Sequence, residues 1–256
     1  MEKAKEFLLH PVFISIIALF VIGVILYYLV INAPEVPSAE RVIHFKGKED
    51  SKIVITEYTD FQCPACKDFF ATKKQIIEKY GNYIKFEVRH FPLNTIHPNA
   101  QSAAEAAEAA GAQGKFFEYS EILFERQGES QNWNTEKFVE YAREVGVNDI
   151  DRFRKELVNR YYQKAVIESL NEAQSKGFTG TPTVLINGRV YELNGRPSVP
   201  SYSELESEIL KLAKGYGIEI KTDGSSQNTG NNNISPTVTE STEQKIENNQ
   251  NNTQTE

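Results

Sequence analysis

The sequence predicts an α/β domain with an all-helical insertion, preceded by an N-terminal transmembrane helix. Three observations lead to this fold class: a strand-helix-strand pattern over residues 52–91, purely helical periodicity over residues 98–177, and an uncharged apolar run at residues 12–31. The chain has 256 residues and a net charge of −7. Charges of both signs are mixed along it, so it offers no basic surface for a nucleic acid.

Residues 12–31 predict a membrane anchor, because such a run forms a helix of about 30 Å, the thickness of one bilayer core. Lys3 and Lys5 precede the run and the first basic residue after it is Arg41, so the positive-inside rule places residues 1–11 in the cytoplasm. A cleaved signal peptide is the alternative, but its apolar region is usually only about 7–15 residues long. We therefore expect a single-pass protein of the cell membrane, with the bulk of the chain on the extracytoplasmic side.

The rest of the chain divides into three further segments. Residues 32–41 contain two prolines and predict a short, stiff linker. Residues 42–221 are expected to fold as one domain, with the helical insertion at 94–178. Residues 222–256 are rich in Asn, Gln and Thr and have almost no large apolar side chain, so we expect a disordered tail.

The folded part begins with a βαβ unit. Residues 52–58 are β-branched and apolar on both faces, which is typical of a central strand. A helix is expected from Pro64, since proline suits the first helical position, and it should end at Gly81. Residues 83–91 then alternate as a second, parallel strand. The loop between the first strand and the helix lies at the edge where open α/β sheets place their chemistry.

Helical periodicity follows without a strand pattern. Helices are expected over residues 99–110 and 115–127, from Asn134 or Thr135, and from Asp149 toward Lys176. Two short strands at 183–186 and 190–193 flank an Asn-Gly pair, which is a strong hairpin signal. The last helix should begin with a capping box at Ser203 and Glu206 and stop at Gly215.

Cys63 and Cys66 are the only cysteines of the chain. Free N–H groups and the dipole at a helix start stabilise a thiolate, so the pKa of Cys63 should fall, and Cys66 lies close enough to close a reversible disulfide. A structural staple is the alternative, but so short a loop would contribute only about 2 kcal/mol. Half of a zinc site would normally need a His-x₃₋₅-His pair, which the sequence lacks, so we expect neither a metal nor a cofactor. His90 and His97 are not next to the cysteines and are expected to be structural or surface residues.

Several motifs stand in a fixed order along residues 42–215. They are Asp60-Phe61-Gln62-Cys63-Pro64-Ala65-Cys66, His90-Phe91-Pro92-Leu93, His97-Pro98-Asn99-Ala100, Gly180-Thr181-Pro182-Thr183 and Asn187-Gly188. Together with the order of the elements, they resemble the DsbA-like thiol–disulfide oxidoreductases of the thioredoxin fold. The apolar run and the asparagine-rich tail depart from this family, whose members carry them only in part.

The two cysteines and the residues between them have distinct expected roles. Cys63 is nearer the helix start and more exposed, so it should be the nucleophile that carries the mixed disulfide. Cys66, one turn further in, should be the buried resolving partner. Pro64 and Ala65 tune the redox pair, and because neither has a side-chain donor, we expect backbone N–H groups and the helix dipole to supply most of the thiolate stabilisation.

Three further residues complete the expected site. Glu57 lies on a buried strand face, where burial would raise its pKa and let it relay a proton to or from Cys66. The family keeps an acid at this offset; a solvent-facing glutamate on an edge strand is the alternative. An X-Pro bond is usually trans, but the resemblance implies a cis bond at Pro182, opposite the cysteines. The backbone of Thr181 would then pair with an extended substrate segment.

The resemblance implies a membrane-tethered oxidase that introduces disulfides into reduced or unfolded exported proteins. The reduced enzyme would pass its electrons to a quinone-linked membrane protein of the DsbB or vitamin-K-epoxide-reductase-like type. A disulfide isomerase is one alternative, but such enzymes usually carry a separate dimerisation domain. A reductase is another, although reductases of this fold usually have Trp before the first cysteine, where this chain has Gln62. A peptide-binding or chaperone module without redox chemistry is the third.

Overall fold

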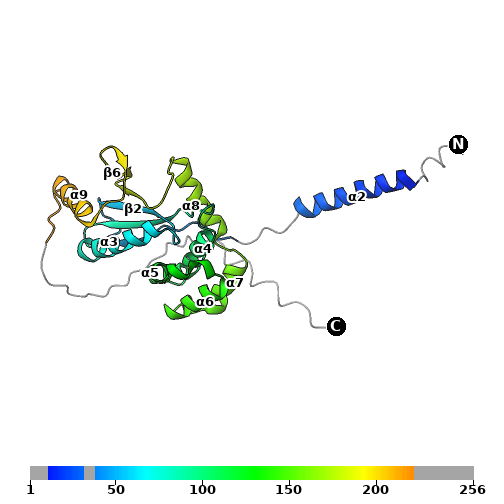
Figure 1. Ribbon diagram of the computed structural model, residues 1–256, viewed down its shortest axis with the longest axis horizontal. Coiled ribbons are helices and arrows are strands. Elements are labelled where there is room, and N and C mark those ends of the chain that lie inside the picture. Colours follow the sequence, from blue (N-terminus) through cyan, green and yellow to red (C-terminus); the bar gives the residue numbers. More distant parts are fainter. Residues whose placement is uncertain (1–10, 32–37, 222–256) are drawn as a thin grey trace, which may run out of the picture. The chain divides into compact units, whose positions relative to one another are not determined.

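The computed structural model describes residues 11–31 and 38–221 of the chain. The chain divides into two compact units, residues 1–37 and residues 38–256. Helix α2, Pro11–Ile31, covers the apolar run of the first unit (Figure 1). Among the residues that the structure describes, no helix is both long and apolar enough to cross a membrane. The predicted cytoplasmic segment up to residue 10, most of the predicted linker and the predicted tail from residue 222 lie outside the described residues.

A mixed five-stranded sheet forms the centre of the second unit (Figure 1). Its strand order is β1-β3-β2-β4-β5. The strands are β1 His44–Gly47, β2 Val54–Thr59, β3 Lys85–His90, β4 Thr183–Ile186 and β5 Arg189–Val190. β2 and β3 run parallel, as the βαβ pattern predicts, whereas β1 and β4 are antiparallel to their neighbours. The register pairs Tyr58 of β2 with Thr183 of β4, which brings the segment just before Thr183 to the carboxyl end of β2.

Helices cover both faces of the sheet. On one face, α3 (Pro64–Tyr80) places Lys73 against Glu57 of β2, and α9 (Tyr202–Gly215) packs beside α3. On the other face, α8 (Gln163–Ser175) places Glu172 against Tyr58 of the same strand. Successive side chains of a strand point to opposite faces, so Glu57 and Tyr58 identify the two layers.

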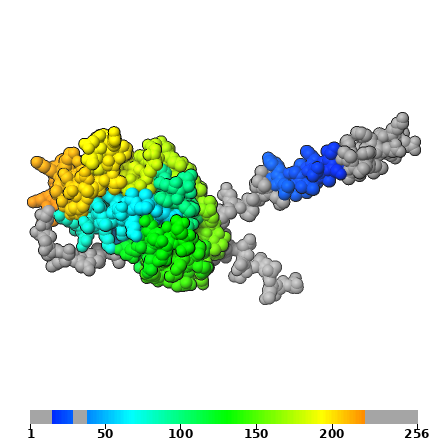
Figure 2. Space-filling view, in the orientation of Figure 1, coloured from blue at the N-terminus to red at the C-terminus, as the bar shows by residue number. Residues whose placement is uncertain are grey.

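The insertion is entirely helical, as predicted. It comprises α4 Ala100–Gly111, α5 Phe116–Glu125, the 3₁₀ helix η1 Gln127–Asn132, α6 Thr135–Glu144, α7 Ile150–Val158 and α8 Gln163–Ser175. Its central helix is α4, whose buried alanines let α5, α7 and α8 pack closely around it. Figure 2 shows the green helices of the insertion at one side of the unit and the yellow and orange C-terminal elements at another.

The buried face of α4 also carries an acid. Glu108 Oε2 lies 2.9 Å from His44 Nε2, and its Oε1 lies 2.8 Å from His90 Nε2. Burial alone would raise the pKa of Glu108, but the charges and hydrogen bonds of the two histidines lower it to about 2. His90 is therefore a structural residue that ties β3 to the insertion, as expected.

Two predicted elements differ from the structure, and one strand was not predicted. The helix expected from Asp149 toward Lys176 is broken between α7 and α8, where Arg160 takes a left-handed conformation with φ 52°. The second strand of the predicted hairpin continues as a separate two-stranded sheet of β6 (Glu192–Leu193) and β7 (Arg196–Pro197). The short edge strand β1 had no clear sequence pattern, and most of its side chains are only half-buried.

The predicted cap of α9 is wrong by two residues. The capping box joins Ser201 and Glu204, not Ser203 and Glu206: the Ser201 side chain accepts from the Glu204 N–H, while the Glu204 carboxylate accepts from the Ser201 N–H. Both serine-glutamate pairs have the spacing of a capping box, so spacing alone did not separate them. Pro200 precedes Ser201 and is the last residue before the cap.

The backbone at Gly47 leaves no room for a side chain. Gly47 ends β1 with φ 97°, and a Cβ there would clash with the carbonyl oxygen of Ile84 and lie 2.9 Å from that of Gly81. Gly47→Ala should therefore lower the free energy of unfolding by about 2 kcal/mol or more, measured by urea denaturation. Gly128→Ala is the matched control, because that glycine has no atom within 4 Å of its Cβ position and no positive φ. Equal losses in the two variants would contradict this account of the β1 end.

Candidate active site

Cys63 and Cys66 lie at the start of α3, directly after β2. Cys63 is the N-cap residue, with extended backbone, and Pro64 opens the helix. The carbonyl oxygen of Cys63 accepts hydrogen bonds from the N–H groups of Cys66 and Lys67, at 3.1 and 3.2 Å. Both cysteines are free thiols. Cys63 is 7% exposed and Cys66 is 0% exposed, so the sulfur nearer the helix start is the more accessible one.

The Thr181-Pro182 segment lies against the first sulfur. The peptide bond between Thr181 and Pro182 is cis, the conformation that the resemblance implied. The Cys63 thiol donates a hydrogen bond to the carbonyl oxygen of Thr181 at 3.3 Å. The Thr181 hydroxyl is buried and has no hydrogen-bond partner among the described residues. An ionised sulfur accepts hydrogen bonds and cannot donate one, so the Thr181 hydroxyl can donate a hydrogen bond to the Cys63 thiolate.

The environment drives the two thiol pKa values apart. A hydrogen bond from the Cys66 thiol is the largest cause that lowers the pKa of Cys63 to about 5, and it outweighs the opposing effect of burial. The side chain of Thr181 and the N–H groups of Cys66 and Ala65 add to the lowering. Burial, followed by the Cys63 sulfur and the charge of Glu57, raises the pKa of Cys66 well above its usual value. One cysteine is thus a ready thiolate and the other a thiol.

This result corrects one expectation. The sequence analysis assigned most of the thiolate stabilisation to backbone N–H groups and the helix dipole. The largest contribution comes instead from the Cys66 thiol, and the backbone N–H of Ala65 is a smaller one. Pro64 has no N–H to donate. The two largest contributions to the lowering of the Cys63 pKa therefore come from side chains outside the Pro64-Ala65 dipeptide, those of Cys66 and Thr181.

Glu57 is fully buried beneath the cysteines, which excludes the solvent-facing alternative. It is not alone there: Lys73 Nζ donates to Glu57 Oε2 at 2.7 Å, and the Lys73 side chain is only 5% exposed. The ammonium group also lies 5.1 and 5.5 Å from the ring centres of Phe70 and Phe124. The second carboxylate oxygen, Glu57 Oε1, is buried and has no hydrogen-bond partner among the described residues. The proton-relay role of Glu57 stays a prediction.

The sequence analysis missed Lys73, although a signal for it exists. Phe69, Ile76 and Tyr80 form the buried stripe of α3, and Lys73 occupies the position four residues after Phe69 on the same stripe. A lysine inside an apolar helical stripe needs a buried partner. Glu57, on the strand that this helix covers, is that partner.

The helical insertion holds the cysteine turn from the side. Gln127 Nε2, on η1, donates to the carbonyl oxygens of Phe61 and Cys63 at 2.9 and 3.0 Å. The side-chain oxygen of Gln62 accepts from the N–H of Asn99 at 2.6 Å. His97, expected to be a structural or surface residue, lies closer to the site than its place in the sequence suggested, because its ring pairs with Asp60.

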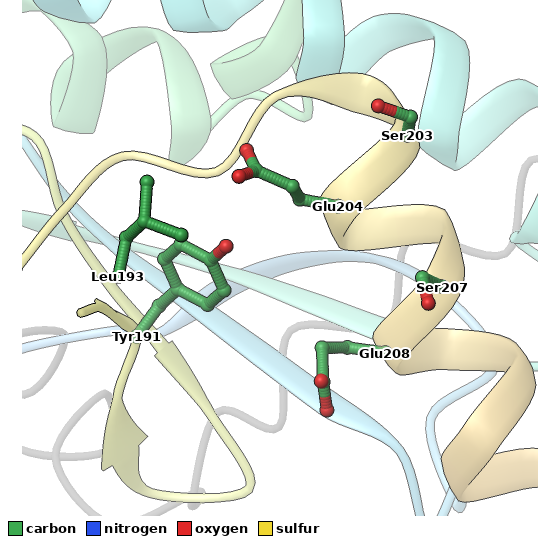
Figure 3. A pocket seen from close by; sticks show the side chains of 6 residues that line it. All are labelled: Tyr191, Leu193, Ser203, Glu204, Ser207 and Glu208. Atoms are coloured by element: carbon green, nitrogen blue, oxygen red, sulfur yellow. The ribbon is translucent and has the colours of Figure 1, made fainter. Parts of the chain in front are cut away.

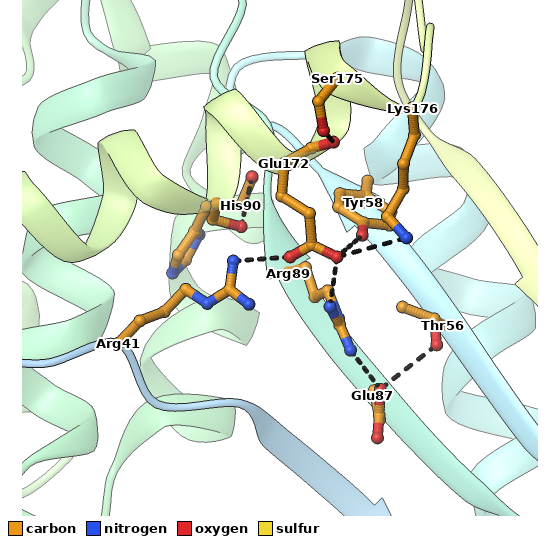
Figure 4. Close-up of polar contacts among 10 residues, drawn as sticks. Arg41, Thr56, Tyr58, Glu87, Arg89, His90, Glu172, Ser175 and Lys176 are labelled. Atoms are coloured by element: carbon orange, nitrogen blue, oxygen red, sulfur yellow. Dashed lines mark hydrogen bonds and ion pairs between the residues drawn. The ribbon is translucent and has the colours of Figure 1, made fainter. Parts of the chain in front are cut away.

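A second polar cluster fixes α8 on the opposite sheet face. Glu172 accepts from Arg41, Arg89 and Tyr58 at 2.6, 2.7 and 2.7 Å (Figure 4). Burial, followed by the hydrogen bond to Glu172, raises the pKa of Tyr58 to about 12. Because Tyr58 pairs with Thr183 across the sheet, this cluster supports the strand that follows the cis-proline.

A shallow pocket lies between the β6 region and α9 (Figure 3). Its volume is about 250 Å³, and it is lined by Tyr191, Leu193, Ser203, Glu204, Ser207 and Glu208. None of these belongs to the predicted site. Among the residues that the structure describes, no group of three or more His, Cys, Asp or Glu side chains could hold a metal ion.

A βαβ unit with a Cys-x-x-Cys at the helix start and a cis-proline opposite defines a thioredoxin-fold dithiol site. The sequence profile of the family described as Thioredoxin matches residues 40–203. This chain belongs to the thioredoxin family, and its fold is that of the DsbA-like proteins.

Two solved structures illustrate the likeness. Oxidised BdbD from Bacillus subtilis superposes with a TM-score of 0.61 and 22% identity, over 70% of this chain and 98% of BdbD. MdbA from Actinomyces oris, a thiol-disulfide oxidoreductase, gives a TM-score of 0.55 with 18% identity, over 66% of this chain and 87% of MdbA.

The curated relatives are much longer proteins. Na(+)/H(+) antiporter NhaA 1 from Salinispora arenicola is 37% identical over 146 residues, which are 57% of this chain and 22% of the antiporter. The chain therefore spans about a fifth of the length of the curated relatives it matches.

The buried ion pair of Lys73 and Glu57 should contribute to stability, because neither charge can be left alone in the core. Lys73→Met leaves Glu57 buried without its cation and should lower the free energy of unfolding by about 3–5 kcal/mol in urea denaturation. Combining it with Glu57→Gln removes the uncompensated charge and should recover most of the loss. Lys74→Met is the matched control on the next residue, where the side chain is 61% exposed and its pair with Glu121 should be worth about 1 kcal/mol or less. Equal losses for Lys73→Met and Lys74→Met would contradict the buried pair.

Proposed function

We propose that this chain is a thiol:disulfide oxidoreductase that acts as an oxidase on exported proteins. The observation that carries the proposal is the divergence of the two cysteines: the Cys63 pKa is lowered to about 5, whereas the Cys66 pKa is raised. A sulfur that is stable as a thiolate is a good leaving group, so a disulfide containing it passes readily to another protein.

The reaction balances as a two-electron exchange. A substrate thiolate attacks Cys63 in the Cys63–Cys66 disulfide, and the Cys66 sulfur leaves. Because burial raises the pKa of Cys66, this sulfur takes up a proton, and Glu57 is the proposed relay. A second substrate thiolate then attacks the substrate sulfur of the mixed disulfide, and Cys63 leaves as a thiolate. The substrate gains one disulfide and loses two electrons, and the cysteine pair is reduced.

The cis-proline segment is the proposed substrate-binding element. Thr181 lies against the Cys63 sulfur, and an extended substrate segment could add to its backbone by β-strand pairing. In this role, Thr181 and Pro182 hold the substrate sulfur near Cys63. The partner that accepts the electrons is proposed to be a quinone-linked membrane protein of the DsbB or vitamin-K-epoxide-reductase-like type.

Membrane tethering and an extracytoplasmic site are further parts of the proposal. Their support is the uncharged run at residues 12–31 and the positive charge of Lys3 and Lys5 before it. Relatives named as Na(+)/H(+) antiporters carry a similar domain within a longer chain, which favours a place beside a membrane. Disulfides persist outside the cytoplasm, where this dithiol could act.

Three tests separate this function from its alternatives. The equilibrium of the Cys63–Cys66 pair with glutathione should lie near the oxidising, DsbA-like end of the scale, about −120 mV, rather than near about −270 mV for thioredoxin. Catalytic amounts of oxidised protein should also accelerate disulfide formation in a reduced, unfolded protein. With a disulfide-containing protein as substrate, Cys66→Ser should trap a mixed disulfide, visible by non-reducing electrophoresis: Cys63 attacks the substrate disulfide, one substrate thiolate leaves, and no Cys66 sulfur remains to resolve the bond.

Each alternative has its own signature. A potential at the thioredoxin end would overturn the oxidase in favour of a reductase. Rapid rearrangement of scrambled disulfides, without net oxidation, would favour an isomerase. Unchanged rescue of an unfolded substrate by Cys63→Ser/Cys66→Ser would favour a peptide-binding or chaperone module.

A further inference from the structure

The side chain of Asp60 is a buried anion at the base of the cysteine turn. It is 0% exposed and accepts three hydrogen bonds. The N–H of Gln62 donates to Oδ1 at 2.7 Å, the N–H of Leu93 donates to Oδ2 at 2.8 Å, and His97 Nδ1 lies 2.8 Å from Oδ2. One carboxyl group thus ties the cysteine turn to the segment after β3 and to His97.

The backbone of the same residue holds both cysteines. The carbonyl oxygen of Asp60 accepts from the N–H of Cys63 at 3.1 Å. The N–H of Asp60 donates to the Sγ of Cys66 at 3.4 Å. The backbone of Asp60 therefore contacts the Cys63 N–H and the Cys66 sulfur, and the same residue carries the buried carboxyl group.

His97 is the ionisable partner of this carboxylate. Among residues 38–221, no other charged or titratable side chain pairs with Asp60. The imidazole is 16% exposed, so it can exchange a proton with water, whereas the carboxylate cannot. A protonated His97 makes the pair neutral, and a neutral His97 leaves a buried negative charge next to the cysteine turn.

The other charged groups around the turn are paired or exposed. They are the Glu57–Lys73 pair below Cys66, Glu108 with His44 and His90 behind Phe61, and the exposed neighbours Lys67 and Asp68 on the first turn of α3. Two of these clusters contain imidazoles, and the acid of the Asp60–His97 pair is the one that is hydrogen-bonded to the cysteine turn itself, through the N–H of Gln62.

We propose that His97 is a positioning residue for the thiol–disulfide reaction, which it controls through the charge of Asp60. When His97 is protonated, the Asp60–His97 pair is neutral and the Cys63 thiolate is stabilised. When His97 loses its proton, the uncompensated Asp60 charge opposes that thiolate. The reduced, thiolate form of the enzyme is thereby favoured at mildly acidic pH, which makes the disulfide a stronger oxidant there. This inference rests on the proposed dithiol function.

His97→Asn tests this inference, since the amide keeps an N–H donor for Asp60 but cannot carry a charge. The readout is the equilibrium constant for oxidation of the Cys63–Cys66 dithiol by glutathione disulfide, which yields the protein disulfide and two glutathione thiols. At pH 6 the variant should show a constant about two- to fivefold above wild type, because its thiolate is less stabilised. At a second, higher pH, chosen by NMR of the wild-type protein so that the His97 ring is neutral, the two proteins should agree.

A matched control removes a histidine elsewhere. His44→Gln keeps a donor for Glu108, is not part of the cysteine turn, and should equal wild type at both pH values. A merely structural role of His97 would change the constant by the same factor at both pH values. A factor that does not depend on pH, an unchanged constant at pH 6, or the same shift in His44→Gln would each overturn the inference.

The wild-type protein gives an independent test if His97→Asn does not fold. Because coupling is reciprocal, the imidazole of His97 should hold its proton more tightly in the reduced than in the oxidised protein, measured by NMR titration of its ring protons. Identical titrations in the two redox forms would overturn the inference. The oxidase proposal is tested separately, because it fails if the wild-type equilibrium with glutathione lies at the thioredoxin end of the scale. The ratio of the His97→Asn constant to the wild-type constant can still be measured in that case.

Discussion

The pairing of the Cys63 and Cys66 thiols at the start of α3 is the interaction on which the site depends. It makes one sulfur an acceptor and keeps the other protonated, so the same contact lowers the Cys63 pKa and raises the Cys66 pKa. If the turn opened, the Cys63 pKa would lose its largest lowering contribution, whereas burial, the first cause at Cys66, would still raise the pKa of that thiol. The rest of the fold can be understood as the means of keeping these two sulfurs in place.

Three separate parts of the chain provide that support. The β2–β4 register brings Thr181 against Cys63. The insertion contributes Gln127, whose amide holds two carbonyl oxygens of the turn. Below the turn, the pair of Glu57 and Lys73 brings ionisable groups into an apolar layer without a net charge. Buried pairs of this kind cost desolvation energy, and their retention here accords with a role in moving a proton to Cys66.

Much of the fold and the two cysteines could be predicted from the sequence, because periodicity, Pro64 and the Asn187-Gly188 turn are local signals. The misses arose where two local solutions compete or where the cause is tertiary. Ser201 and Ser203 both fit a capping box, and only the path of the chain after Pro200 decides between them. Lys73 and His97 acquire their roles from partners 16 and 37 residues away, Glu57 and Asp60, which no local pattern connects.

The central claim is that the folded site holds the Cys63 sulfur as a thiolate. Its most direct test is titration of the thiolate absorbance near 240 nm in the reduced protein, with Cys63→Ser as the blank. The account predicts a single thiolate that appears with a midpoint at a pH of about 5 and is lost in the blank. A midpoint near about 8.5, the value of an unperturbed cysteine, would contradict it.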